Sequence, residues 1–142
     1  MDNSVIETLH DIHTATNDVL KGYSEMESRS KPDILPVIRR LTDMHQKHAN
    51  ELVSELRQWR ETGEDDTSLQ GTLNKVVVVL RDWIADLDRD ALPAVRQGEE
   101  SLRDKYVAAL QNDGLKGQQR LMQLLQSQHD EIVGEISRLP KT

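Results

Sequence analysis

Apolar residues recur at intervals of three and four along most of the chain, which is the spacing of one face of an α-helix. No segment shows the sustained alternation of apolar and polar residues that a strand would produce. Proline, glycine and an Asn-Asp-Gly sequence divide the pattern into five segments. The predicted helices are 4–28, 33–62, 69–87, 90–111 and 115–139.

The third segment differs from the others because it contains four consecutive valines, 76–79. Such a β-branched run would suit a strand, but the sequence offers no second strand to pair with it, so we interpret it as a buried helix turn. Its broad apolar face covers the other helices or forms a surface for a homodimer or another protein partner. That face consists of Val76, Val77, Leu80, Trp83 and Ile84.

The other four segments are long, and short connections link the first to the second and the fourth to the fifth. Helices linked in this way pack as antiparallel neighbours. The connection from the second to the fourth segment is about as long as a helix and carries the third segment, so it can run the length of a bundle. We therefore expect a single all-α domain over 1–142, made of two antiparallel hairpins joined by a long crossover with an extra helix.

Composition narrows the classes of protein that the chain can belong to. A length of 142 residues suits one domain, and the absence of cysteine excludes disulfides and thiolate metal sites. The first ten residues have neither the basic nor the apolar part of a signal peptide, and no apolar run reaches the length of a membrane span. The net charge of −7 and the scarcity of aromatic residues argue against nucleic-acid binding. We expect a cytoplasmic protein without a membrane or nucleic-acid partner.

Each of the four long predicted helices has a polar residue in the middle of its apolar stripe. These residues are Thr16, His48, Glu99 and His129. If the two helices of each hairpin are level, Thr16 faces His48, and Glu99 faces His129. Polar residues at matching heights predict a polar layer across the core, and buried polar groups need hydrogen-bond partners or a metal.

The residues around this layer resemble a known superfamily. Tyr106 follows Glu99 by two helical turns, Tyr23 follows Thr16 by the same spacing, and a helix reads H-A-x-x-L from His48. On a bundle of two hairpins with a long crossover, these features resemble the ferritin-like (rubrerythrin-like) superfamily. The stretches NDVLKGY, HQKHANEL, QGEESLRDKY and QSQHDEI look more narrowly like a bacterial ferritin-like branch, a four-helix-bundle domain of unknown function.

The resemblance implies a di-iron centre, which takes one Glu from each of two helices and a Glu-x-x-His from each of the other two. In chain order, the matching positions here are Thr16, His45 with His48, Glu99, and Gln126 with His129. Only Glu99 keeps its carboxylate, and Thr, His and Gln do not supply the negative charge that two iron ions require. We therefore do not expect ferroxidase or oxygen-activating chemistry.

Two interpretations stay open. In the first, His45, His48, Glu99 and His129 form a hydrogen-bonded layer in a metal-free core, and the protein is non-catalytic, with a structural or stress-related role. In the second, His48, Glu99 and His129 bind one divalent metal ion (Zn²⁺, Fe²⁺ or Mn²⁺), with His45 as a further candidate, in a metal-binding protein or metalloenzyme. The side chains expected around the ligands are Gln126, Tyr23, Tyr106 and Thr16. No nucleophile motif or phosphate-binding loop favours an enzyme.

The first helix also carries an H-x-x-H sequence, His10 and His13. His13 lies one turn before the polar layer, where Glu51 of the second helix should be level with it. We expect an ion pair at the edge of the bundle rather than a set of metal ligands.

Overall fold

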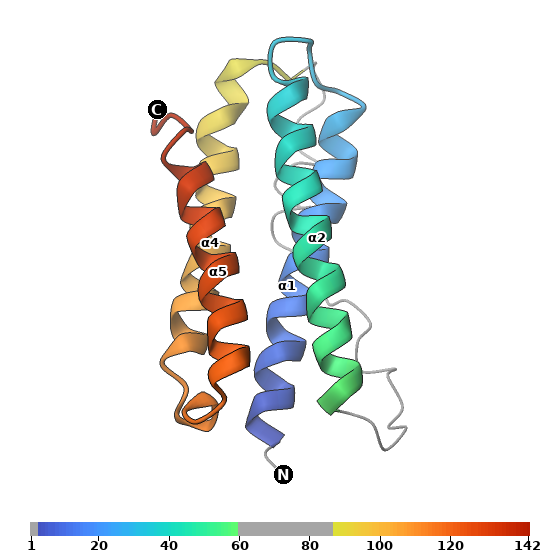
Figure 1. The fold of residues 1–142 in the computed structure, drawn as a ribbon. Coiled ribbons are helices and arrows are strands. Elements are labelled where there is room, and N and C mark those ends of the chain that lie inside the picture. The colour runs from blue at the N-terminus through green and yellow to red at the C-terminus, as the bar shows by residue number, and fades with distance from the viewer. Residues whose placement is uncertain (1–2, 60–86) are drawn as a thin grey trace.

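A computed structural model of the protein describes residues 3–59 and 87–142, and these residues form long helices lying side by side (Figure 1). The α-helices are α1 (Asn3–Glu27), α2 (Leu35–Trp59), α4 (Leu92–Leu110) and α5 (Gln119–Ile136). Two short 3-10 helices, η2 (Arg89–Ala91) and η3 (Asp113–Leu115), flank α4. The predicted all-α class is confirmed for this part of the chain.

The limits predicted for the last helix are wrong at both ends. The chain does not enter α5 at residue 115, because Gly117 has a φ of +91°, which no residue of a right-handed helix can adopt. Before it, the Asn112 side chain accepts a hydrogen bond from the amide of Gly114 and closes η3 as a separate turn. After Ile136 the helix ends in a turn, and the buried Leu139 still packs on the core.

The fourth predicted helix divides into η2 and α4. Asp88 caps η2 by accepting a hydrogen bond from the amide of Asp90, and Pro93 lies in the first turn of α4, where its missing N–H costs nothing. The helix predicted over 69–87, with its apolar docking face, lies outside the described residues except for Leu87, which is buried.

Two contacts at opposite ends of the bundle set the directions of the helices. At one end, the amide of Lys31 donates to the carbonyl of Leu87, and the amide of Leu87 donates to the carbonyl of Arg29, each at 2.8 Å. At the other end, the side-chain amide of Asn112 donates to the hydroxyl of Thr8 at 2.8 Å. The start of α1 therefore lies beside the end of α4, so α4 runs antiparallel to α1 and parallel to α2 (Figure 1). As expected, α1 pairs with α2 and α4 with α5.

The core receives apolar side chains from all four long helices, among them Leu9, Leu41, Leu102 and Leu125. Each such side chain contributes about 1.5–3 kcal/mol when it leaves water. The outer faces are charged, and no helix in the described ranges is both long and apolar enough to cross a membrane. The apolar core is interrupted near mid-height by polar side chains, which form the candidate site.

Candidate functional site

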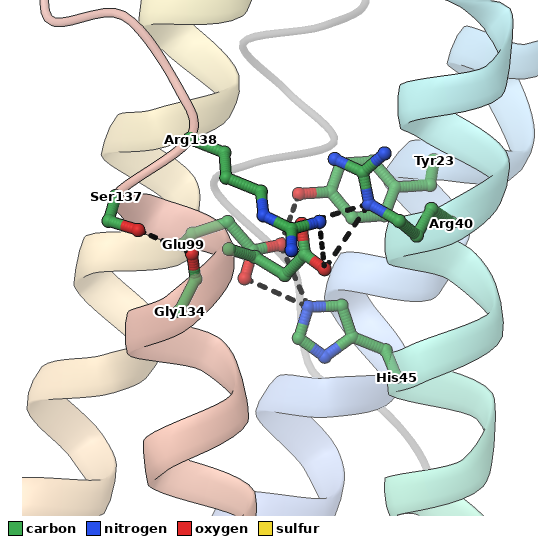
Figure 2. A network of polar contacts seen from close by, with 8 residues as sticks. Tyr23, Arg40, His45, Glu99, Gly134, Ser137 and Arg138 are labelled. Atoms are coloured by element: carbon green, nitrogen blue, oxygen red, sulfur yellow. Dashed lines mark hydrogen bonds and ion pairs between the residues drawn. The ribbon is translucent and has the colours of Figure 1, made fainter.

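Glu99 of α4 is fully buried and lies at the centre of a cluster with α1 and α2 (Figure 2). The hydroxyl of Tyr23 donates to its Oε2 atom, and Nε2 of His45 lies 3.0 Å from Oε1 and 2.8 Å from Oε2. The ring of Tyr23 also stacks on that of His45, with centroids 6.1 Å apart. Three helices thus supply one side chain each, and both oxygens of the buried carboxylate have a donor.

The pKa of Tyr23 is raised well above its ordinary value, mainly by burial and further by the nearby charge of Glu99. Tyr23 therefore keeps its proton throughout the physiological pH range. It acts as a fixed hydrogen-bond donor to the carboxylate.

His48, one turn further along α2, faces α5 instead. Its Nε2 atom lies 2.8 Å from Oε1 of Glu131, while Nζ of Lys47 lies 3.0 Å from Oε2 of the same carboxylate. Burial lowers the pKa of His48, although the hydrogen bond to Glu131 opposes this effect. Burial alone would raise the pKa of Glu131, but the hydrogen bonds from Lys47 and His48 outweigh it and lower that pKa.

Gln128 is the buried polar residue of α5 in this layer. Its Oε1 atom accepts a hydrogen bond from the hydroxyl of Tyr106 at 2.6 Å, and its Nε2 atom donates to Oε1 of Glu51 at 2.8 Å. Burial raises the pKa of Tyr106. The hydroxyl of Thr16 donates to the carbonyl of Ile12 on its own helix. The hydroxyl groups and the Gln128 amide of this part of the layer thus all have hydrogen-bond partners.

The predicted pairing of Glu99 with His129 is wrong. His129 is only partly buried, and its Nδ1 atom lies 3.0 Å from Oδ1 of Asp130. Gln126 is exposed and also donates to Asp130, so neither residue of the expected fourth-helix motif lies against Glu99. Thr16 and His48, which were expected to face each other, have the separate hydrogen-bond partners Ile12 and Glu131.

The cause lies in the rotation of α5. Its buried stripe passes through Leu125 and Ile132. Positions 128 and 129 each lie three or four residues from both, so the spacing alone lets either one face the core. Val133 is among the most exposed large apolar residues in the described ranges, so the buried face is centred toward 128. The sequence does not predict that Val133 is exposed, because Val133 is as apolar as the buried Ile132.

The edge pair predicted for His13 is also absent. Nε2 of His13 lies 3.4 Å from the side-chain nitrogen of Asn17, whereas Oε1 of Glu51 accepts the bond from Gln128. Burial lowers the pKa of His13, and the nearby His10 lowers it further.

The donor set does not fit a di-iron centre. Glu99 is the one carboxylate at the four matching positions, and both of its oxygens already accept hydrogen bonds from Tyr23 and His45. Across residues 3–59 and 87–142, no three His, Asp or Glu side chains are grouped so that they could hold a metal ion. Within the layer, the Nδ1 atoms of His45 and His48 are buried without a hydrogen-bond partner, and their rings meet edge to face with centroids 6.0 Å apart.

Sequence reasoning missed two residues that complete the layer, Gln128 and Glu131, and paired a third, Glu51, with His13 instead of Gln128. The signal for Gln128 was the buried tyrosine two turns after Glu99, whose hydroxyl needs an acceptor. Glu51 and Glu131 are charged residues that flank the stripes, and the sequence does not distinguish such residues from ordinary solvated ones.

The family comparison places three of the four long helices within one known family. The family model described as a domain of unknown function (DUF2383) matches residues 4–112, which include Tyr23, His45 and Glu99. No curated protein and no solved structure matches the chain. Since the matched region spans more than half of the sequence, the chain belongs to the DUF2383 family of domains of unknown function.

Proposed function

We propose that this protein is a non-catalytic helical bundle of ferritin-like architecture, in which a hydrogen-bonded polar layer occupies the place of a di-iron centre. The observation that carries the proposal is the saturation of Glu99, the one remaining carboxylate, by Tyr23 and His45. A stress-related role is an expectation from the resemblance to ferritin-like proteins and rests on analogy.

The burial of the layer away from solvent supports a structural role. Glu99 and His45 have no exposed surface, and Tyr23 is buried beside them. A substrate cannot reach a group that the closed bundle covers completely. The described geometry therefore favours a scaffold over an enzyme.

The layer performs a task that apolar contacts do not. Hydrophobic packing is largely non-directional. A carboxylate that is buried without hydrogen-bond donors, in contrast, lowers the stability of the fold by several kcal/mol. Because Glu99 takes its donors from α1 and α2, a shift of either helix by one turn would remove one of its two donors. We infer that the layer fixes the helix register, a role that buried polar groups have in some other proteins.

A metal assay tests the absence of a metal cofactor. The protein is produced without a His tag in medium supplied with zinc, iron and manganese, and the metal content per chain is measured. We expect far less than one metal ion per chain and an unfolding transition that a chelator does not change. One equivalent of bound metal would overturn the proposal.

A second experiment tests the structural role. In the triple variant Tyr23→Phe, His45→Leu and Glu99→Leu, the layer loses its central hydrogen bonds but keeps apolar volume. We expect a helical protein whose backbone NMR spectrum shows several sets of peaks, because registers are no longer distinguished. A control variant, Gln126→Leu, changes a polar residue outside the layer and should keep one set. A single well-dispersed set in the triple variant would refute the structural role.

A mononuclear metal site is the second candidate. The unpartnered Nδ1 atoms of His45 and His48 favour it, since imidazole nitrogens are common ligands of Zn²⁺ and Fe²⁺. Those two residues would hold the ion, and further ligands would have to come from other groups or water. If metal is found in the assay above and is lost in both His45→Ala and His48→Ala but retained in His129→Ala, this candidate replaces the first.

A further inference from the structure

The two hairpins meet along two lines that differ in chemistry. Along the first, which we call the spine, α1 packs directly on α4 and on η3. Tyr23 reaches Glu99 there, and Thr8 accepts the hydrogen bond from Asn112 at the far end. The spine therefore combines close backbone packing with polar contacts at two heights.

Along the second line, which we call the α2–α5 seam, the two backbones approach each other at isolated points at most. Side chains from the two helices bridge the gap instead, and Figure 2 shows Arg40 reaching out from α2. The bridging pairs are Arg40 with Glu135, Lys47 and His48 with Glu131, Glu51 with Gln128, and Glu55 with Arg120.

Two of these bridges, Arg40 with Glu135 and Lys47 with Glu131, are open to water, whereas the others include the buried residues His48, Gln128 and Glu55. The basic side chains of Arg40, Lys47 and Arg120 are 42%, 55% and 66% exposed. Exposed ion pairs contribute little to stability and weaken as salt screens them. The Arg40 and Lys47 pairs of the seam thus break at low cost, and the spine has no such exposed ion pair among the contacts named above.

The described end of the connection between the hairpins, from Leu87 to Ala91, has a point about which such an opening could turn. Leu87 is tied by two backbone hydrogen bonds to the loop between α1 and α2, so it belongs to the first hairpin. Only Asp88, in an extended conformation, separates Leu87 from η2 and the second hairpin. Rotation about the φ angle of Asp88 would turn the second hairpin relative to the first and keep the hydrogen bonds from Asp90 and Ala91 to Asp88.

We propose that the bundle opens along the α2–α5 seam while the spine stays closed, and that this opening gives solvent access to Gln128, His48 and the polar layer. Opening is promoted by ionic strength, because salt screens the pairs that close the seam. The inference goes beyond the structural role proposed above, since it supplies a route to groups that the closed bundle seals, and it does not depend on that role.

The absence of cysteine from the sequence makes thiol labelling a direct test. Gln128→Cys places one buried thiol at the seam, and Thr16→Cys places one buried thiol beside Tyr106 at the spine. Each variant is labelled under native conditions at about 0.01 M and 1 M salt, between which the screening length falls from roughly 30 to 3 Å. Urea unfolding of each variant gives the labelling rate that global unfolding alone would allow.

We expect the thiol at position 128 to react faster than global unfolding allows, and faster still at high salt. The thiol at position 16 should react only at the global rate. If both thiols react at their global rates, or if the seam thiol is insensitive to salt, the proposal is wrong.

Two adjacent arginines provide a matched control. Arg40 pairs with Glu135 across the seam, whereas Arg39 pairs with Glu27 inside the first hairpin, each at 3.0 Å. Adding Arg40→Met to Gln128→Cys should speed labelling by up to about fivefold, the range expected for one exposed pair. Adding Arg39→Met should leave the rate unchanged, and equal effects of the two changes would overturn the proposal.

A second measurement covers the case in which Gln128→Cys does not fold. Hydrogen exchange at the imidazole C2 position is followed for His48, which lies on the seam, relative to His129, which is already partly exposed. In the otherwise unchanged chain, Arg40→Met should accelerate exchange at His48 and Arg39→Met should not. No acceleration by Arg40→Met would refute the opening.

Discussion

Replacing Tyr23 with Phe removes one hydroxyl from the buried cluster and leaves the ring in place. Oε2 of Glu99 then keeps only the hydrogen bond from His45. A hydrogen bond to a charged partner is worth about 1.5–3 kcal/mol, so we expect Tyr23→Phe to lower the free energy of unfolding by that amount.

Tyr106→Phe is the matched comparison because Tyr106 is equally buried but donates to an amide oxygen, that of Gln128. A bond between neutral groups contributes about 0.5–1.5 kcal/mol, so this variant should lose roughly half as much. Both changes keep the same aromatic volume, and the difference between them isolates the charge of the acceptor.

The measurement is urea unfolding followed by circular dichroism at 222 nm, with thermal unfolding as a second probe. For a chain of this size, each kcal/mol corresponds to a shift of roughly 3–5 °C in Tm. The denaturant slope should be the same for both variants and the parent, because neither change alters the surface exposed on unfolding.

Equal losses for the two variants, or a larger loss for Tyr106→Phe, would refute the reasoning. Either result would mean that Tyr23 does not donate to an ionised carboxylate in a dry layer. A water molecule replacing the lost hydroxyl would give a small loss for Tyr23→Phe, and exchange of the His45 imidazole protons with solvent would reveal it.

Three further predictions follow from separate features. Burial holds the pKa values of His48 and His13 below the ordinary value of 6.5. Between these folded-state pKa values and 6.5, the unfolded chain therefore binds more protons than the folded chain. Stability should therefore fall as pH drops below 6.5, and urea midpoints between about pH 5 and 8 should show a weaker decline in His48→Gln. Gly134→Ala should stabilise by about 0.5–1 kcal/mol, since a Cβ there meets no atom within 4 Å, whereas Gly117→Ala, at a φ of +91°, should destabilise by about 1–2 kcal/mol in thermal unfolding. Arg96→Met removes hydrogen bonds to the carbonyl of Ile136, the last residue of α5, and to that of Leu139 in the turn that follows, so hydrogen–deuterium exchange should rise in that turn while the rest of α5 is unchanged.

The sequence was sufficient for the presence of α1, α2, α4 and α5, because each has a long apolar stripe that fits only one period. It was insufficient at Gly117, where a positive φ interrupts the pattern without changing its apolar spacing. Nothing in the local sequence distinguishes a glycine that bends the chain from one that a helix tolerates, as Gly134 shows.

The sequence predicted which buried polar residues of the first three long helices contribute to the candidate site, but not which partner each of them binds. Thr16, His48 and Glu99 are buried as expected, since each lies between apolar residues of one stripe. Which partner each one meets depends on the rotation of whole helices. The rotation of α2 about its axis directs His45 to α4 and His48 to α5, although both residues lie on the same apolar face.

The fixed layer and the weak seam constrain each other through Glu99. Its two donors, Tyr23 and His45, both belong to the first hairpin, while Glu99 belongs to the second. A wide opening would stretch the bond to His45, which is buried, whereas a narrow one need only break the exposed pairs between α2 and α5. The buried bond therefore limits the amplitude of opening, and the exposed pairs set its frequency. Loss of the bond from Tyr23 alone should lower global stability yet leave the salt dependence of seam labelling unchanged, because salt acts on pairs that this change does not touch.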